Sequence, residues 1–220
     1  MITLPDVVIT GPPVVGKGTI CKVLRELGYS SIIDTGKRVR QELAELGEDA
    51  PERNRQGEYG SEMIRAHGGG YFVDRMLQDL PGPHIINGPR RAVEIDYMLG
   101  RGAIVVFVNA DESRRHVWSC VRNTERDGLS YQEFLAKDML EWGYVPDMNG
   151  SYRRHNNPYE RNLHYALGKA HVTFDNSGTR EELQNMTRSF VDDLHNELVG
   201  PNGTWQQRTY RSKMVFSHRL

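Results

Sequence analysis

The feature that most limits what this chain can fold into is a glycine-rich stretch near its N-terminus, residues 11–19, which reads GPPVVGKGT. A short apolar run, residues 7–10, precedes it, and a segment with helical spacing follows it, with Ile20, Leu24 and Leu27 on one face. A tight glycine turn between a strand and a helix is the setting that a phosphate-binding loop requires. The alternative is a plain glycine turn with a surface lysine, and the flanking strand and helix favour the phosphate-binding loop.

The chemistry of this loop follows from its residue types. Glycines at 11 and 16 let the backbone N–H groups point inward to hold phosphate oxygens, and the following helix N-terminus adds partial positive charge. Lys17 can reach the β- and γ-phosphates of ATP, and the Thr19 hydroxyl can bind Mg²⁺, so we expect ATP and Mg²⁺ as cofactors, with Thr19 as the metal ligand. The predicted ATP-binding residues of the loop are Gly11, Pro13, Val14, Val15, Gly16, Lys17, Gly18, Thr19 and Ile20.

The composition indicates one domain without a strong charge bias. The 220 residues include 28 Lys and Arg against 29 Asp and Glu, so net charge favours neither nucleic acid nor an anionic membrane as a partner. The two cysteines lie in apolar helical contexts, which favours a reduced, cytoplasmic protein. The N-terminus carries neither a charged leader nor a long apolar segment, and we expect neither a signal peptide nor a membrane span.

Apolar runs and helical segments alternate along the chain. Strands are predicted at residues 7–10, 31–34, 84–87, 103–108 and 171–174, with amphipathic helices between them. This alternation predicts an α/β fold in which a mostly parallel five-stranded sheet is the middle of three α/β/α layers. Together with the glycine-rich loop at residues 11–19, it favours the P-loop NTPase type of this fold. Ligands on such a sheet bind beyond the carboxyl ends of its strands.

The remaining segments are predicted to be additions to this core. Residues 1–199 are expected to form the P-loop domain, with a helical acceptor-binding segment at about 36–72 and a lid at about 122–162, and residues 200–220 are expected to form a polar tail. Residues 144–162 are rich in Tyr, Arg, Asn and Pro and lack periodicity, as a loop or lid insertion would. In the helix that Asp111 caps, spacing predicts that Val117, Trp118 and Val121 face inward and that Arg114, Arg115 and Arg122 face outward.

Two motifs at strand ends carry a family resemblance. Thr35-Gly36 with Arg40 follows the second predicted strand, and Gly88 with Arg90 and Glu94 follows the third. Together with the Gly-Lys-Gly-Thr loop, this arrangement resembles adenylate kinases. A guanidinium suits the acceptor site because its planar fork grips a phosphate through two parallel hydrogen bonds, although Arg40 could also be an ordinary exposed arginine on a helix. The acceptor-binding residues that the resemblance implies are Thr35, Gly36, Arg40, Gly88, Arg90 and Glu94.

Two residues depart from the adenylate kinase pattern. Asn87 stands where the family has an aspartate that carries negative charge toward Mg²⁺ and its waters, and an amide offers only a carbonyl oxygen. Val14 stands where the family usually has glycine, and a β-branched side chain restricts the loop backbone. Asp34 could take over part of the aspartate's role, which makes Asp34 a candidate catalytic residue beside Lys17.

The second half of the chain resembles a related group of kinases. The run from Asn176 to Thr179 looks like the segment beside the adenine of ATP in dephospho-coenzyme A kinases and archaeal kinase-like proteins, which implies that Asn176 and Gly178 bind ATP. A threonine N-cap explains the same residues as a plain helix start. Arg122 and Arg126 resemble the lid arginines of these kinases, which cover the transferring phosphoryl group, and exposure on a solvated helix is the alternative for both.

These features lead to one expected function and three alternatives. We expect ATP-dependent phosphoryl transfer to a nucleoside monophosphate, including a deoxynucleotide, because Lys17, Arg40 and Arg90 supply cations where two phosphate chains must meet. The alternatives are a kinase of a hydroxyl acceptor such as dephospho-coenzyme A, a kinase of a nucleotide within a nucleic acid, and a non-catalytic ATP-binding regulator. A small-molecule nucleotide is favoured over nucleic acid as the partner, and no membrane partner is expected.

Overall fold

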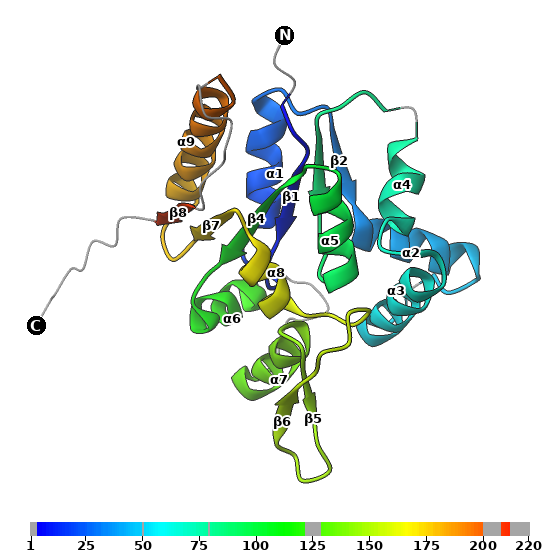
Figure 1. Ribbon diagram of the computed structural model, residues 1–220. Helices are drawn as coiled ribbons and strands as arrows, with labels where there is room; N and C mark the ends of the chain where they lie inside the picture. Colours follow the sequence, from blue (N-terminus) through cyan, green and yellow to red (C-terminus); the bar gives the residue numbers. More distant parts are fainter. Residues whose placement is uncertain (1–3, 50, 79, 122–128, 200–207, 212–220) are drawn as a thin grey trace, which may run out of the picture.

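The computed structural model describes residues 4–49, 51–78, 80–121, 129–199 and 208–211 (Figure 1). Its centre is a six-stranded sheet in the order β2-β3-β1-β4-β7-β8, in which all neighbouring strands are parallel. The α/β prediction with a mostly parallel sheet is therefore confirmed. The strands are β1 Val7–Thr10, β2 Ser31–Asp34, β3 His84–Asn87, β4 Ile104–Asn109, β7 Val172–Asp175 and β8 Arg208–Arg211.

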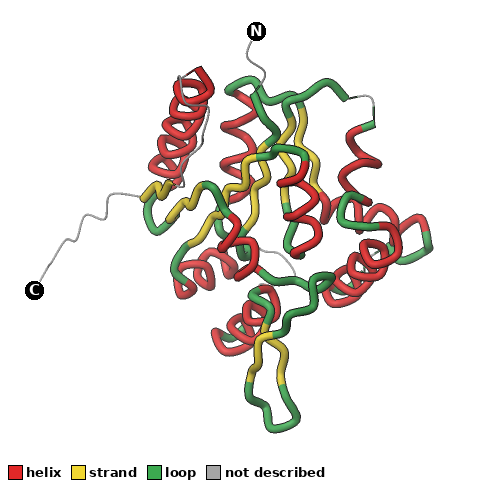
Figure 2. The backbone as a smooth tube through the Cα atoms, viewed as in Figure 1, coloured by secondary structure: helices red, strands yellow, loops and turns green. Residues whose placement is uncertain are grey.

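Helices cover both faces of this sheet (Figures 1 and 2). One face carries α1 Lys17–Glu26 and α9 Arg180–Val199, and the other carries α5 Ala92–Gly100 and α8 Leu163–Lys169. Among the helices of the described ranges, none combines the length and the apolar character that crossing a bilayer requires. The other elements are α2 Thr35–Glu45, α3 Arg53–His67 and α4 Tyr71–Leu77 on the β2 side, α6 Glu112–Val121 and α7 Tyr131–Glu141 after β4, and a hairpin of β5 Tyr144–Pro146 with β6 Tyr152–Arg154.

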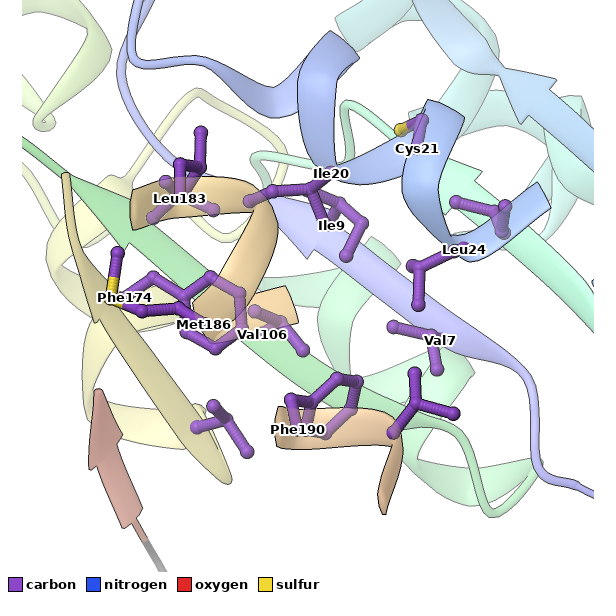
Figure 3. Packing of buried hydrophobic residues seen from close by; sticks show 14 of the residues in the cluster. Val7, Ile9, Ile20, Cys21, Leu24, Val106, Phe174, Leu183, Met186 and Phe190 are labelled. Carbon is purple, nitrogen blue, oxygen red and sulfur yellow. The ribbon is translucent and has the colours of Figure 1, made fainter. Parts of the chain in front are cut away.

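Side chains of the central strands alternate between two cores. On β1, Val7 and Ile9 pack with α1 and α9, whereas Val8 packs on the opposite face with α5 and α8. Figure 3 shows the first core, where the rings of Phe174 and Phe190 meet edge to face with 6.0 Å between their centroids. Burying an aromatic side chain of this kind contributes about 1.5–3 kcal/mol. Burial on both faces explains why these strands appear as continuous apolar runs in the sequence.

The prediction of five strands is wrong by one, because the polar tail supplies the sixth. Strand β8 pairs in parallel with β7 at the sheet edge. Its Tyr210 meets the rings of Phe174 and Phe190 edge to face and donates a hydrogen bond to the Asp193 carboxylate. The sequence of β8, RTYR, has no apolar alternation. The strand does not need one, because backbone pairing with β7 and the packing of one aromatic ring keep it in the sheet.

The segment expected to lack regular structure contains the antiparallel β5–β6 hairpin, which projects from the body of the molecule (Figure 2). The Asp147 carboxylate accepts hydrogen bonds from the backbone N–H groups of Asn149 and Ser151, both at 2.9 Å, and so closes the turn. Only three residues form each strand, which is too short for a clear period-two pattern.

The predicted orientation of α6 is confirmed for the exposed Arg114 and for Trp118, which packs against the core, and it is wrong for three other side chains. The predicted outward Arg122 lies outside the described residues. Val117 and Val121 are 58% and 79% exposed, whereas Arg115 is only 2% exposed. The Arg115 guanidinium donates to both carboxylate oxygens of Asp138 on α7, at 2.6 and 2.7 Å. The Arg115 guanidinium can be buried because the Asp138 carboxylate neutralises its charge and accepts its hydrogen bonds. The helical spacing within α6 cannot predict a partner on α7.

His171 should make stability depend on pH. The ring Nδ1 of His171 accepts a hydrogen bond from the Val105 N–H at 3.0 Å, and burial lowers the pKa of His171 below its ordinary value of 6.5. Below pH 6.5 the unfolded chain binds a proton that the folded chain resists, so the free energy of unfolding should fall as pH drops through 6.5 toward the lowered folded-state pKa. Urea unfolding between pH 7.5 and 5 should show this decline.

The matching variant is His171→Asn, which cannot titrate in this range. It should reduce the pH slope of the free energy of unfolding without removing it, because burial and the nearby Arg154 also lower the pKa of His164. A slope identical to that of the unaltered protein would show that His171 does not cause the decline.

Candidate functional site

The loop of residues 11–16, which is predicted to bind phosphate, joins β1 to α1, and its shape requires glycine at two positions. Gly11 has φ of 136°, and a Cβ there would lie 2.1 Å from the carbonyl oxygen of Val108. Gly16 has φ of 92°, and a Cβ there would lie 2.7 Å from the side-chain amide nitrogen of Asn176. The loop therefore packs directly on the carboxyl end of β4 and on the turn after β7.

Val14 is strained in the same loop. Its φ of 62° lies in the left-handed region, which is a genuine outlier for a β-branched residue. Val14→Gly should relieve about 1–2 kcal/mol of this strain. The glycine also makes the unfolded chain more flexible, which offsets part of the gain and leaves a net increase of about 1 kcal/mol in the free energy of unfolding. Urea unfolding measures this change.

The control for Val14→Gly is Val15→Gly in the neighbouring position. Val15 is 1% exposed and belongs to the core between α1 and α9, so its removal should destabilise the protein by about 2 kcal/mol. Destabilisation by Val14→Gly would mean that contacts of the valine side chain outweigh the strain in its backbone.

The loop borders an open cleft of about 1130 Å³. Gly11 and Ile20 are buried behind the loop and do not line it. Three residues that no motif indicated also line it, namely Lys22, Trp118 and Arg180. The predicted ATP-binding residues that line the cleft are Pro13, Val14, Val15, Gly16, Lys17, Gly18 and Thr19 from the loop and Asn176 and Gly178 from the segment after β7.

Two polar side chains hold this region together. The Lys17 ammonium donates hydrogen bonds to the carbonyl oxygens of Gly11 and Pro12 at 2.8 and 2.6 Å, so the lysine lies within the curve of the loop. Asn176 is 6% exposed, and its amide donates to the Val15 carbonyl at 3.1 Å. Asn176 therefore fastens the turn after β7 to the phosphate-binding loop.

A second, smaller cavity of about 200 Å³ lies beside the first. It opens at the carboxyl ends of β2 and β3, and α2 and α3 form its far side. Its lining contains all six predicted acceptor-binding residues, Thr35, Gly36, Arg40, Gly88, Arg90 and Glu94. The two cavities share six lining residues, Lys17, Asp34, Arg40, Gln56, Asn87 and Arg90.

Asp34 and Asn87 form a pair where the two cavities meet. One carboxylate oxygen of Asp34 accepts the Lys37 N–H at 2.7 Å and so caps α2, and the other accepts the Asn87 amide N–H at 2.8 Å. The amide oxygen of Asn87 is buried and accepts no hydrogen bond from any residue that the structure describes. A buried, unsatisfied oxygen beside a carboxylate is a place where a water or a cation can gain a ligand.

A buried thiol lies behind the loop on α1. Burial, and to a lesser extent the charge of Asp34, raises the pKa of Cys21 to about 12. Cys21 is therefore a neutral thiol at physiological pH and is unsuited to act as a nucleophile.

Arginines from distant segments converge on the smaller cavity. Arg40 is exposed and makes no ion pair with any residue in the described ranges, whereas Arg90 donates to the Glu141 carboxylate at 2.5 Å. Arg91 is buried and donates to the carbonyl oxygens of Gly57 and Tyr159, both at 2.9 Å. Glu94 also lies in the lining, where its carboxylate accepts the backbone N–H groups of Arg90 and Arg91, both at 3.0 Å.

Sequence analysis missed Arg161, which also lines this cavity. The sequence feature that could have indicated this arginine is a pair of glycines in α3, Gly57 and Gly60. A Cβ on Gly57 would lie 3.1 Å from the Arg161 guanidinium, and a Cβ on Gly60 would lie 2.7 Å from that of Arg91. Glycines inside a helix cost stability, and two of them three residues apart indicate that other groups approach the helix closely. The two predicted lid arginines, Arg122 and Arg126, lie outside the described residues.

Comparison with known proteins gives structural relatives only. The sequence matches no family model and no curated protein. A shikimate kinase from Bacteroides thetaiotaomicron is similar with a TM-score of 0.54 and 14% identity, over 89% of this chain and 99% of that one. A shikimate kinase from Acinetobacter baumannii in complex with shikimate gives 0.56 and 12%, over 90% and 97%. A gluconokinase from Sinorhizobium meliloti 1021 gives 0.50 and 13%, over 90% and 97%. At such low identities the likeness shows the fold, which is that of kinases with a phosphate-binding loop.

Proposed function

We propose that this protein is an ATP-dependent kinase that transfers the γ-phosphoryl group to a nucleoside monophosphate. The observation that carries the proposal is the contact between the two cavities. Lys17, Arg40 and Arg90 line both of them, so a donor phosphate in the large cleft and an acceptor phosphate in the small one would meet among cations. Phosphoryl transfer depends on this positioning and charge neutralisation more than on covalent chemistry.

Each side chain has a role in this proposal. Lys17 would leave the loop carbonyls to contact the β- and γ-phosphates. Arg40 and Arg90 would hold the acceptor phosphate, which is itself the nucleophile and is largely ionised at neutral pH because its second pKa is about 6. A protein base is then unnecessary, and Asp34 would orient the acceptor.

The residues at the junction fit Mg²⁺. This ion keeps several waters and binds through one or two protein oxygens together with substrate phosphates. The Thr19 hydroxyl would be its direct ligand, with the Asp34 carboxylate and the unsatisfied Asn87 oxygen facing its water shell. Among the described residues, no group of three or more His, Cys, Asp or Glu could hold a metal ion. When bound, Mg²⁺ would neutralise part of the phosphate charge.

The adenine of ATP would lie at the far end of the large cleft. Trp118 from α6 and Leu183 from α9 line this cleft and would supply the apolar surface for the base. An indole face stacks well on a purine, which gives this end of the cleft a preference for a base. The half-buried Trp118 would report ATP binding through its fluorescence.

A kinase of a hydroxyl acceptor is the second candidate. Asp34 lies in both cavities, where its carboxylate could remove a proton from a hydroxyl group. Structural relatives named as kinases of shikimate and gluconate share the fold. The number of arginines in the small cavity favours the phosphate acceptor over a neutral hydroxyl compound.

The test is transfer of label from γ-labelled ATP with Mg²⁺ to a panel of acceptors. The panel contains ribo- and deoxynucleoside monophosphates, dephospho-coenzyme A, shikimate, gluconate and oligonucleotides. Label on nucleoside monophosphates supports the proposal, and label only on a hydroxyl compound supports the second candidate. Tight ATP binding without transfer to any acceptor would favour a regulator.

A further inference from the structure

A single buried carboxylate holds two arginines of the small cavity. Glu141 at the end of α7 has a side chain that is 0% exposed, and it accepts hydrogen bonds from Arg90 at 2.5 Å and from Arg161 at 3.2 Å. The arginine side chains remain 19% and 20% exposed and line the cavity. Glu141 itself does not line it, so the carboxylate lies behind the two guanidinium groups.

The backbone fixes the same pair. Arg90 follows β3 and Arg161 precedes α8, yet the Asn162 N–H donates to the Arg90 carbonyl at 2.8 Å, and Arg91 and Arg161 form an antiparallel bridge. On the other side, the missing side chain of Gly57 gives the Arg161 guanidinium its place against α3. Main-chain pairing, the carboxylate and the glycine thus fix the orientation of both arginines before any ligand binds.

The charges of this cavity select a strongly anionic ligand. The lining carries five cationic side chains and two carboxylates, and Glu141 adds a third carboxylate behind it, which leaves an excess of two positive charges. A phosphate monoester carries close to two negative charges at neutral pH. A carboxylate or a neutral polyol would leave cations without a partner. The cations are Lys17, Arg40, Arg90, Arg91 and Arg161, and the lining carboxylates are Asp34 and Glu94.

We infer that Glu141 is a positioning residue that holds Arg90 and Arg161 as a clamp for the phosphate monoester of the acceptor. This inference rests on the proposed function and adds to it Arg161 as a substrate-binding residue. The buried carboxylate fixes the spacing of the two guanidinium groups, so their remaining N–H donors face one ligand together. Two guanidinium groups held at a fixed spacing lose less side-chain entropy when they bind a phosphate than two unconstrained arginines would.

The experiment compares Glu141→Gln and Arg161→Gln with Asp138→Asn as the matched control. Asp138 lies one turn earlier on α7 and holds the buried Arg115, so its variant also breaks a buried ion pair but touches neither cavity. Inorganic phosphate is titrated by calorimetry into protein whose large cleft is filled with Mg²⁺ and a non-hydrolysable ATP analogue. Acceptor KM and ATP KM are measured separately.

Glu141→Gln and Arg161→Gln should each weaken phosphate binding and raise acceptor KM by about tenfold, with ATP KM unchanged. The double variant should lose less than the product of the two effects, because Glu141 acts partly through Arg161. Asp138→Asn should lower Tm and leave phosphate binding unaltered. Arg161 is partly exposed, so Arg161→Gln keeps the test informative if Glu141→Gln fails to fold.

Three results separate the inference from the proposed function. In a protein that transfers phosphoryl groups, any of three results would overturn the inference alone. These are unaltered phosphate binding in Arg161→Gln, multiplicative effects of the two substitutions on phosphate binding in the double variant, and a loss of phosphate binding in Asp138→Asn equal to that in Glu141→Gln. Loss of phosphate binding in the clamp variants of a protein that transfers no phosphoryl group would overturn the proposed function and leave the inference standing. A protein that neither transfers phosphoryl groups nor binds phosphate would overturn both.

Discussion

Lys17→Ala is expected to lower kcat/KM for phosphoryl transfer by about a thousandfold, the upper range for removal of one preorganised donor from a transition state. The Lys17 ammonium donates hydrogen bonds to the carbonyl oxygens of Gly11 and Pro12, so the loop holds this charge where the phosphates would bind. Alanine removes that charge at the point where negative charge builds up during transfer. Initial rates with labelled ATP and the best acceptor measure the effect.

The matched control is Lys137→Ala. Lys137 is exposed on α7 and lines neither cavity, so the same loss of one lysine should leave kcat/KM within about twofold. Lys17 is half-buried and contributes no apolar packing to the core, so Lys17→Ala should retain the Tm of the parent within a few degrees. Turnover unchanged by Lys17→Ala would remove the phosphate-binding assignment of residues 11–19.

The parts of this protein that the sequence predicts are those with local causes. The apolar runs of β1 and β4 and the glycine turn between β1 and α1 all depend on residues close to one another in the sequence. Parallel strands then bring their carboxyl ends to one edge by geometry alone. For this reason the sequence alone predicts that the motifs after β1, β2 and β3 lie together at one edge of the sheet.

The parts that the sequence does not predict depend on partners far along the chain. Arg115 has the sequence context of a surface residue, and only the structure shows that it is paired with Asp138. Arg161 lies in a stretch without periodicity, and its position depends on contacts with Glu141 and Gly57. Strand β8 has no apolar pattern because backbone pairing with β7 holds it. Long-range charge pairing and edge-strand addition leave no periodic pattern in the sequence, since each side of the contact is an ordinary polar segment.

Val14, which stands where adenylate kinases usually have glycine, has a strained backbone conformation. The sequence indicates only that valine replaces the usual glycine, whereas the structure shows that the backbone keeps a positive φ of 62° despite the side chain. The loop shape is therefore imposed by its surroundings, by Gly11 on Val108 and Gly16 on Asn176, and not by the preference of residue 14.

Arg40→Ala is expected to raise the acceptor KM by about a hundredfold and to leave the ATP KM nearly unchanged. Arg40 is exposed, lines both cavities and has no carboxylate partner in the described part of the chain, so its whole hydrogen-bonding capacity is available to a ligand. Loss of a two-point hydrogen bond to a charged phosphate costs up to about 3 kcal/mol, which corresponds to that factor. Arg40→Lys keeps the charge without the fork, and about a tenfold increase is expected from it.

Arg38→Ala is the matched control for Arg40→Ala, two residues earlier on α2. Arg38 is ion-paired with Glu42 and Glu45 and lines neither cavity, so its variant should alter stability and leave both KM values as they are. A change confined to ATP KM in Arg40→Ala would mean that the donor and acceptor sites are reversed. Equal effects of Arg38→Ala and Arg40→Ala would mean that α2 contributes general positive charge and that no specific contact is made, because only Arg40 reaches the cavities.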